Sequence, residues 1–196
     1  MRKLKLAVVQ PALAEGECAA NWRAARAALE RAGSAGADLV VLPEMWLTGY
    51  AYRRLDELAK LTPESLARVG ALARKYGYFV AGSWAERNDE GRLTNTACIV
   101  GPDGRVRARY RKVHLFGPMK EDRHFAAGVN RAGRSVSVLF GGGSAVVGPR
   151  GDFLAQLGPE EGFAEVEIDL DEVAATREQI TYLADRAREV DEFLYR

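Results

Sequence analysis

The pattern of hydrophobic and polar positions predicts a strand–helix–strand unit at the start of the chain. Residues 4–10 and 39–42 form short apolar runs, and the second is unbroken, as in a strand covered on both faces. Between them, apolar residues over 19–31 recur at steps of three and four, which is typical of a helix with one buried face. Two strands joined through a helix are expected to be parallel, with a right-handed crossover.

The pattern changes to a β-meander in the middle of the chain. A helix is expected from Thr62, as N-cap, to Gly77, because Pro63 suits the first helical position. Strands follow over 79–86 and 93–100, and turn residues lead from them into a third strand. Further short strands are expected over residues 136–140, 145–147, 153–157 and 162–168, followed by a helix from about residue 172. The segment 181–196 is expected to be a helix or an extended arm.

A carboxylate follows directly on the buried strand at 39–42. Pro43 ends this strand, because it has no N–H for a sheet ladder, and Glu44 comes next. Open α/β sheets bind their ligands at the carboxyl ends of parallel strands, so Glu44 is a candidate functional residue. The alternative is structural: Glu44 caps the following turn or pairs with a nearby arginine.

The third strand of the meander carries an alternating row of charge. Arg105, Arg107, Arg109 and Arg111 alternate with apolar residues, so period two puts the arginines on one face. Lys112 then falls in phase with the apolar face, where a lysine is costly unless a carboxylate pairs with it. Glu44 is the leading candidate for that partner. Alternatively, the strand ends at Arg111 and Lys112 turns out to solvent.

Composition narrows the class of protein. The chain has 196 residues, 47% hydrophobic and 28% charged, which suits one domain with a buried core. The net charge of +1 gives no basic excess for nucleic acid, and no apolar stretch approaches membrane-spanning length. Cys18 and Cys98 have no metal-ligand or disulfide spacing, and there are only two histidines. We therefore expect a cytoplasmic domain without metal or cofactor.

Several of these segments together resemble the nitrilase superfamily of carbon–nitrogen hydrolases, in its small-amidase, ω-amidase-like branch. They follow the order of the family and run through nearly the whole chain. The segments are 36–50 (GADLVVLPEMWLTGY), 95–97 (NTA), 101–104 (GPDG), 110–116 (YRKVHLF), 142–151 (GGSAVVGPRG) and 168–171 (IDLD).

The resemblance implies a fold and a set of catalytic roles. The fold is an α/β, four-layer α-β-β-α sandwich, and the activity is hydrolysis of small amides through a Glu–Lys–Cys triad. Glu44 matches the general base and Lys112 the lysine that stabilises the oxyanion. Glu121 matches a second glutamate that positions the substrate. Family members commonly form dimers, so a homo-oligomer is expected.

The chain departs from the family where the nucleophile should lie. The cysteine segment should follow Gly128, but Gly128 leads directly into Val129, which resembles a stretch further downstream. The chain is short by roughly a quarter of a family domain, a large loss for one core. We expect strands and helices after about residue 128 to be missing, which leaves an unpaired sheet edge near residues 125–140.

No other residue is a convincing nucleophile. Cys18 and Cys98 lie where the family has none, and free cysteines are commonly small buried hydrophobic residues. Ser144 has no activating context and matches a sheet residue of the family. We therefore expect a single carbon–nitrogen hydrolase domain over 1–196 with little or no amidase activity. The alternatives are a non-catalytic binding or assembly partner, and an internally deleted product without function.

Overall fold

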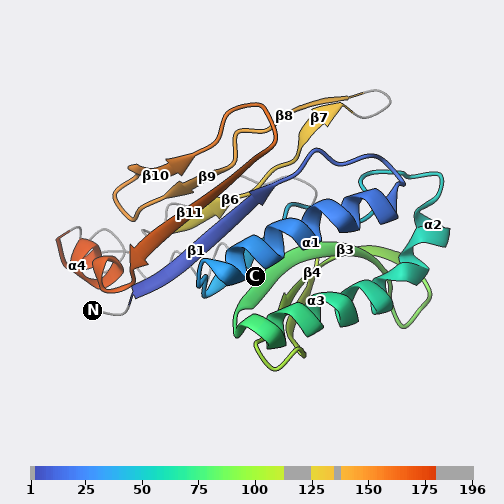
Figure 1. Cartoon of the computed structure of the whole chain (residues 1–196), viewed down its shortest axis with the longest axis horizontal. Helices are drawn as coiled ribbons and strands as arrows, with labels where there is room; N and C mark the ends of the chain where they lie inside the picture. The colour runs from blue at the N-terminus through green and yellow to red at the C-terminus, as the bar shows by residue number, and fades with distance from the viewer. Residues whose placement is uncertain (1–2, 113–124, 135–137, 180–196) are drawn as a thin grey trace, which may run out of the picture.

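The computed structural model of the chain describes residues 3–112, 125–134 and 138–179 (Figure 1). The helical elements are α1 (Cys18–Ser34), α2 (Leu55–Leu58), the 3-10 helix η1 (Ala59–Leu61), α3 (Thr62–Tyr76) and α4 (Asp171–Gln179). The first strands are β1 (Lys3–Gln10), β2 (Leu39–Val41), β3 (Phe79–Arg87), β4 (Leu93–Val100) and β5 (Val106–Arg111). The later strands are β6 (Ala126–Gly128), β7 (Ala132–Arg134), β8 (Leu139–Gly141), β9 (Ala145–Val147), β10 (Phe153–Gln156) and β11 (Gly162–Asp169).

The largest sheet has six strands in the order β11-β1-β2-β3-β4-β5. Strand β2 pairs in parallel with both β1 and β3, whereas β3, β4 and β5 pair antiparallel as a meander. Strand β11 returns from the end of the chain and pairs antiparallel with β1 along its whole length. The parallel start and the meander are both as the sequence predicts. The carboxyl end of β2, where Pro43 and Glu44 follow, thus lies near the middle of the sheet.

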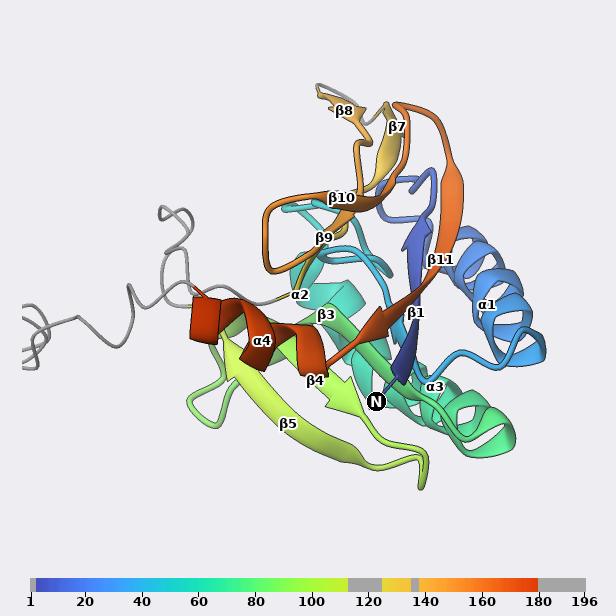
Figure 2. The ribbon, with the colours of Figure 1, turned by 90° about the vertical axis from the view of Figure 1, so that its left-hand side faces the viewer.

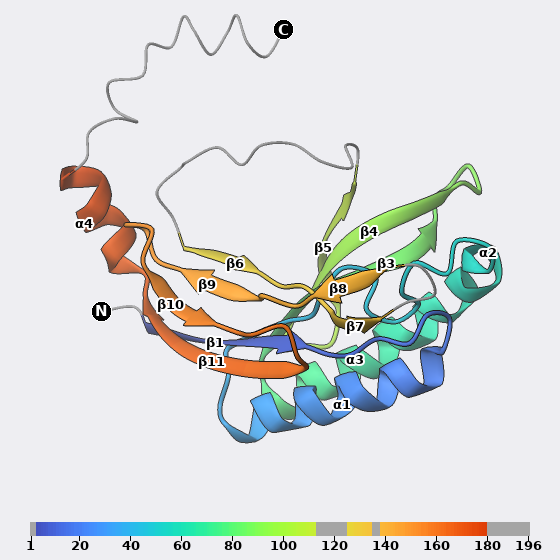
Figure 3. The same cartoon turned by 90° about the horizontal axis from the view of Figure 1, so that it is seen from above.

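Two cores hold this sheet between other layers. Helices α1 and α3 cover one face, and their apolar stripes pack on residues such as Val40, Val80 and Val100. The sheet β10-β9-β6 lies on the other face, over β1 and β11, where Val8 and Val146 meet (Figure 3). The described residues therefore form the α, β and β layers of the expected sandwich, and the α/β fold class is confirmed.

Among the described residues, the strands of the second layer do not extend over the meander. Strands β9 and β10 lie away from β5 in Figure 2. The apolar face of β5 is therefore exposed: Tyr110 is 63% exposed, and Ile99, on the adjoining β4, is 41% exposed. The expectation that this face is buried is wrong for the residues that the structure describes. Among the described residues, β6 lies at the edge of its three-stranded sheet, as expected for an edge near residues 125–140.

One helix start differs from its prediction. Thr62 is the first residue of α3, and its hydroxyl donates a hydrogen bond of 2.6 Å to the carbonyl oxygen of Ala85 in β3. Thr62 therefore ties the helix to the sheet and is not its N-cap, because helix η1 leads directly into α3.

Two of the predictions fall on residues outside the described ranges. These are the position of Glu121 and the form of the segment 181–196. Within the described ranges, no helix is long and apolar enough to cross a membrane.

Candidate active site

The Glu44 carboxylate stands at the start of a run of turns that follows β2. Leu42 still pairs with β3, since its N–H donates to the carbonyl of Ala81 at 2.8 Å. Met45 then has a φ of 52°, which is unusual for a residue with a side chain and costs on the order of 1–3 kcal/mol. The Met45 N–H donates to the hydroxyl of Ser83 at 2.9 Å, which holds this turn on β3. The backbone around Glu44 is therefore strained and anchored.

Lys112 reaches this carboxylate from the far end of the meander. Its Nζ donates to Oε1 of Glu44 at 2.7 Å, and the two side chains are 29% and 38% exposed respectively. The geometry decides between the two readings of Lys112: the lysine points to Glu44 and not freely to solvent. A partly exposed ion pair of this kind contributes about 1 kcal/mol or less to stability, so stability alone does not explain it.

Two further residues surround Glu44 that sequence reasoning did not single out. The side-chain Nδ2 of Asn95 donates to the same Oε1 at 2.5 Å. The Tyr50 hydroxyl interacts with the same carboxylate: burial first, then the charge of Glu44 and a hydrogen bond to it, raise the pKa of Tyr50 above its ordinary value. The alternation within the strand could have pointed to Asn95. It lies two positions before Ala97 and four before Ile99, so its polar side chain shares a face with these apolar residues.

A cavity of about 560 Å³ opens over this group. Polar side chains and apolar residues of β2, β3, β4 and β5 line it together. Its lining includes Glu44, Asn95, Lys112, Val41, Ile99 and Tyr110. A carboxylate that can accept a proton, beside an ammonium group that can stabilise a developing oxyanion, is suited to acyl-transfer chemistry.

Cys98 is among the residues that line the cavity, but the side chain of neither cysteine faces Glu44. Cys98 alternates with Asn95 in β4 and so faces the helices, where it is buried in the core with Val100. Burial raises the pKa of the Cys98 thiol to about 11, which keeps the thiol protonated at neutral pH. Cys18 begins α1 and lines a separate small cavity with Trp22 and Leu47, and burial raises its pKa as well.

Ser144 has a structural role. It is buried, its N–H donates to the side-chain oxygen of Gln10 at 2.8 Å, and its hydroxyl accepts from the N–H of Asn130 at 3.0 Å. These bonds join the end of β1 to the loops that precede β7 and β9. Ser144 is therefore occupied in holding backbone, in agreement with the sequence-based interpretation.

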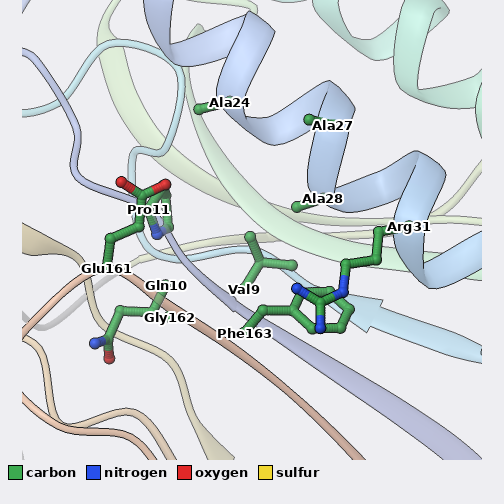
Figure 4. A pocket seen from close by; sticks show the side chains of 10 residues that line it. All are labelled: Val9, Gln10, Pro11, Ala24, Ala27, Ala28, Arg31, Glu161, Gly162 and Phe163. Carbon is green, nitrogen blue, oxygen red and sulfur yellow. The ribbon is translucent and has the colours of Figure 1, made fainter.

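A second cavity, of about 360 Å³, lies on the helix side of the sheet between α1, β1 and β11 (Figure 4). Its wall is mostly small and apolar, including Ala24, Ala28 and Val9. The guanidinium group of Arg31 stacks over the Phe163 ring, 4.3 Å from its centroid. This cavity contains no paired acid and base, so the group around Glu44 is the stronger candidate site.

Known proteins match the chain along nearly all of its length. The carbon–nitrogen hydrolase family model matches residues 5–124 and 120–178. The 2-oxoglutaramate amidase of Bacillus subtilis is 27% identical over 254 aligned positions, which cover 93% of this chain and 97% of that protein. The ω-amidase NIT2 of Danio rerio is 36% identical over 117 residues, or 59% of this chain and 42% of that protein. This chain therefore spans about two fifths of the ω-amidases of this kind.

The solved structures agree on the fold. The NitFhit protein of C. elegans has a TM-score of 0.85 at 19% identity, covering 96% of this chain and 66% of that one. An amidase from Nesterenkonia sp. AN1, with an acetamide moiety bound covalently at its active-site cysteine, has a TM-score of 0.81 at 20% identity, covering 96% and 95%.

The match to the bacterial amidase also bears on length. Its 254 aligned positions exceed the 196 residues of this chain, so part of that relative has no counterpart here. The family model likewise matches in two sections that meet at residues 120–124. A junction near residues 128 and 129 stays a prediction. Since the family model covers most of the sequence, this chain belongs to the carbon–nitrogen hydrolase family.

Proposed function

We propose that this chain binds a small amide in the cavity that Glu44 and Lys112 line and does not hydrolyse it. The observation that carries the proposal is the 2.7 Å pair of Glu44 and Lys112 beside an open cavity. Cys18 lines another cavity, and Cys98 lines this one while its side chain is buried in the core on the opposite face of β4. In an amidase with a nucleophilic cysteine, the thiolate attacks the amide carbonyl, a base moves the protons, and a cation stabilises the oxyanion. In this chain, Glu44 is the candidate for the base and Lys112 for the cation, and no cysteine is a candidate for the thiolate.

The names of the relatives support the substrate class. One is called a 2-oxoglutaramate amidase and others ω-amidases, so the carboxamide end of a short acid is the natural group to test. Lys112 would hold the carbonyl oxygen of such a group, and Glu44 would accept a hydrogen bond from its nitrogen. Without a nucleophile no acyl-enzyme forms, and loss of a covalent step lowers rates by several powers of ten.

The test is to measure binding and turnover of succinamate, a short ω-amide, in parallel. We expect binding by calorimetry, no release of ammonia above the uncatalysed rate, and at least tenfold weaker binding in Lys112→Met. The Cys18→Ala/Cys98→Ala double variant should bind like the wild type. Ammonia release by the wild type would contradict the proposal. If the double variant then releases no ammonia, one of the cysteines is the nucleophile. If the double variant still releases ammonia, Glu44 activates water.

A second function, as an assembly partner, is favoured by a separate observation. The apolar residues Ile99 and Tyr110 are exposed on the face of the meander, and β6 lies at the open edge of its sheet. Exposed apolar surface and unpaired strand edges are typical of sites that bind another polypeptide. Light scattering during titration with a full-length member of the family tests this function, and scattering that equals the sum of the two proteins would exclude it.

A further inference from the structure

Asn95 contacts both members of the Glu44–Lys112 pair. Its backbone carbonyl accepts the N–H of Lys112 at 2.9 Å, while its side-chain Nδ2 donates to Oε1 of Glu44 at 2.5 Å. One residue thereby fixes the backbone that carries the ammonium group and the carboxylate that faces it.

The sheet holds Asn95 more firmly than it holds either partner. Asn95 lies inside β4, paired with Ala85 of β3 on one side, and the pairing of Thr96 with Arg111 on the other side places it opposite Lys112. Glu44, in contrast, lies in a turn, and Lys112 follows the last residue of β5 on a long side chain. The backbone of Asn95 is therefore held by two neighbouring strands, and its short side chain has little freedom to move. The side chains of Glu44 and Lys112 have more freedom, so Asn95 can fix their positions.

The shared oxygen also orients the carboxylate. Lys112 and Asn95 both donate to Oε1, so the plane of the carboxylate is set by two donors from different directions. An ammonium group alone fixes this plane poorly, because it is a compact charge that can rotate. A planar amide donor is directional, and a hydrogen bond to a charged acceptor is stronger than one between neutral groups.

We propose that Asn95 is a positioning residue of this site, which sets the orientation of Glu44 toward a bound amide. The inference rests on the proposed function for its ligand, but the contact of Asn95 with Glu44 does not. Removal of the Asn95 side chain would leave the Glu44–Lys112 ion pair in place and let the Glu44 carboxylate take several orientations. A ligand that needs one of these orientations would bind more weakly, although the charges of the site are unchanged.

A double-mutant cycle on ligand affinity tests this role. We expect Asn95→Ala to weaken succinamate binding about tenfold. In a Glu44→Ala background the same change should alter binding less than about twofold, because Asn95 acts through Glu44. Thr94→Ala is the matched control: it removes a hydroxyl from the adjacent position of β4 that bonds to Glu86 and Thr96 and not to Glu44. An equal loss in both backgrounds, or the same loss in Thr94→Ala, would overturn the proposal.

A second measurement keeps the inference separate from the proposed function. The melting temperatures of the wild type, Asn95→Ala, Glu44→Ala and the double variant are compared without ligand. The double variant should melt no lower than the less stable of the two single variants. Additive lowering would show that Asn95 and Glu44 act independently and would overturn the proposal. If the wild type fails to bind succinamate, the proposed function is wrong, and the melting cycle still decides whether Asn95 positions Glu44.

Discussion

At the scale of single residues, one carboxylate oxygen organises the candidate site. Oε1 of Glu44 accepts from Lys112 and from Asn95, which come from neighbouring strands. Residues of the same meander differ sharply in chemistry according to the face they occupy. Asn95 faces the open cavity, whereas Cys98, three positions later, faces the apolar core. Period two thus puts the Cys98 side chain on the opposite face of β4 from the Asn95 side chain, although Cys98 is among the residues that line the cavity.

The buried thiol makes stability depend on pH in the alkaline range. Burial raises the pKa of Cys98 to about 11 in the folded chain, whereas a thiol in the unfolded chain ionises at about 8.5. Between these values the unfolded state has released the proton and the folded state still holds it, so the free energy of unfolding falls as pH rises. We expect Cys98 to account for a loss of about 2 kcal/mol by pH 10, and the loss to be absent in Cys98→Ala.

Denaturant unfolding at pH 7 and pH 10 measures this effect. Val100→Ala is the control, because Val100 shares the strand face and the core with Cys98 but has no titratable group. Val100→Ala should lower the free energy of unfolding by the same amount at both pH values. Equal pH dependence in wild type and Cys98→Ala would show that the thiol does not contribute.

At the scale of elements, close packing of helix α3 on the meander fixes the position of β5, the strand that leads to Lys112. A Cβ at Gly70 in α3 would lie 2.4 Å from the carbonyl oxygen of Gly104, in the turn between β4 and β5. Helix and turn are thus in backbone contact, and β5 starts from this turn and ends beside Lys112. The position of the ammonium group therefore depends on a glycine far from the site.

Gly70→Ala is expected to lower the free energy of unfolding by about 1–3 kcal/mol, because helix and turn must move apart. In a helix without this contact, the same change would raise stability by about 1 kcal/mol, since alanine favours helix. Thermal or denaturant unfolding distinguishes the two signs. Ala71→Gly, at an exposed position of the same helix, measures the propensity alone. A gain in stability for Gly70→Ala would contradict the backbone contact.

At the scale of the whole molecule, the second sheet is small for the surface it has to cover. Strands β6, β9 and β10 have three or four residues each and lie over β1, β2 and β11, whereas Tyr110 of β5 is exposed. Figure 3 shows the small sheet above β1. The bacterial amidase relative aligns over more positions than this chain has residues. A missing internal block gives one physical account of both observations, and it leaves β6 as an edge.

An open edge of this kind predicts self-association. We expect the chain to form dimers or larger assemblies at micromolar concentration, and Ala127→Lys, in the exposed part of β6, to weaken them. Sedimentation velocity over a range of concentrations measures the change. Ala27→Lys introduces the same charge at an exposed position of α1 and should leave association unchanged. A wild-type chain that sediments as a monomer throughout would contradict the prediction.

The sequence by itself determined the local elements and the identity of the charged pair. Periodicity identified the first parallel strands, the meander and the phase of Lys112, because side-chain alternation depends only on neighbours along the chain. It could not show that Asn95 joins the pair, since that contact depends on the register between β4 and β5 and on the turn after β2. It also assigned a buried face to β5 that lies open, because periodicity tells which residues share a face and not whether anything covers it. That depends on segments distant in the sequence, and only the tertiary structure brings them together or leaves the face exposed.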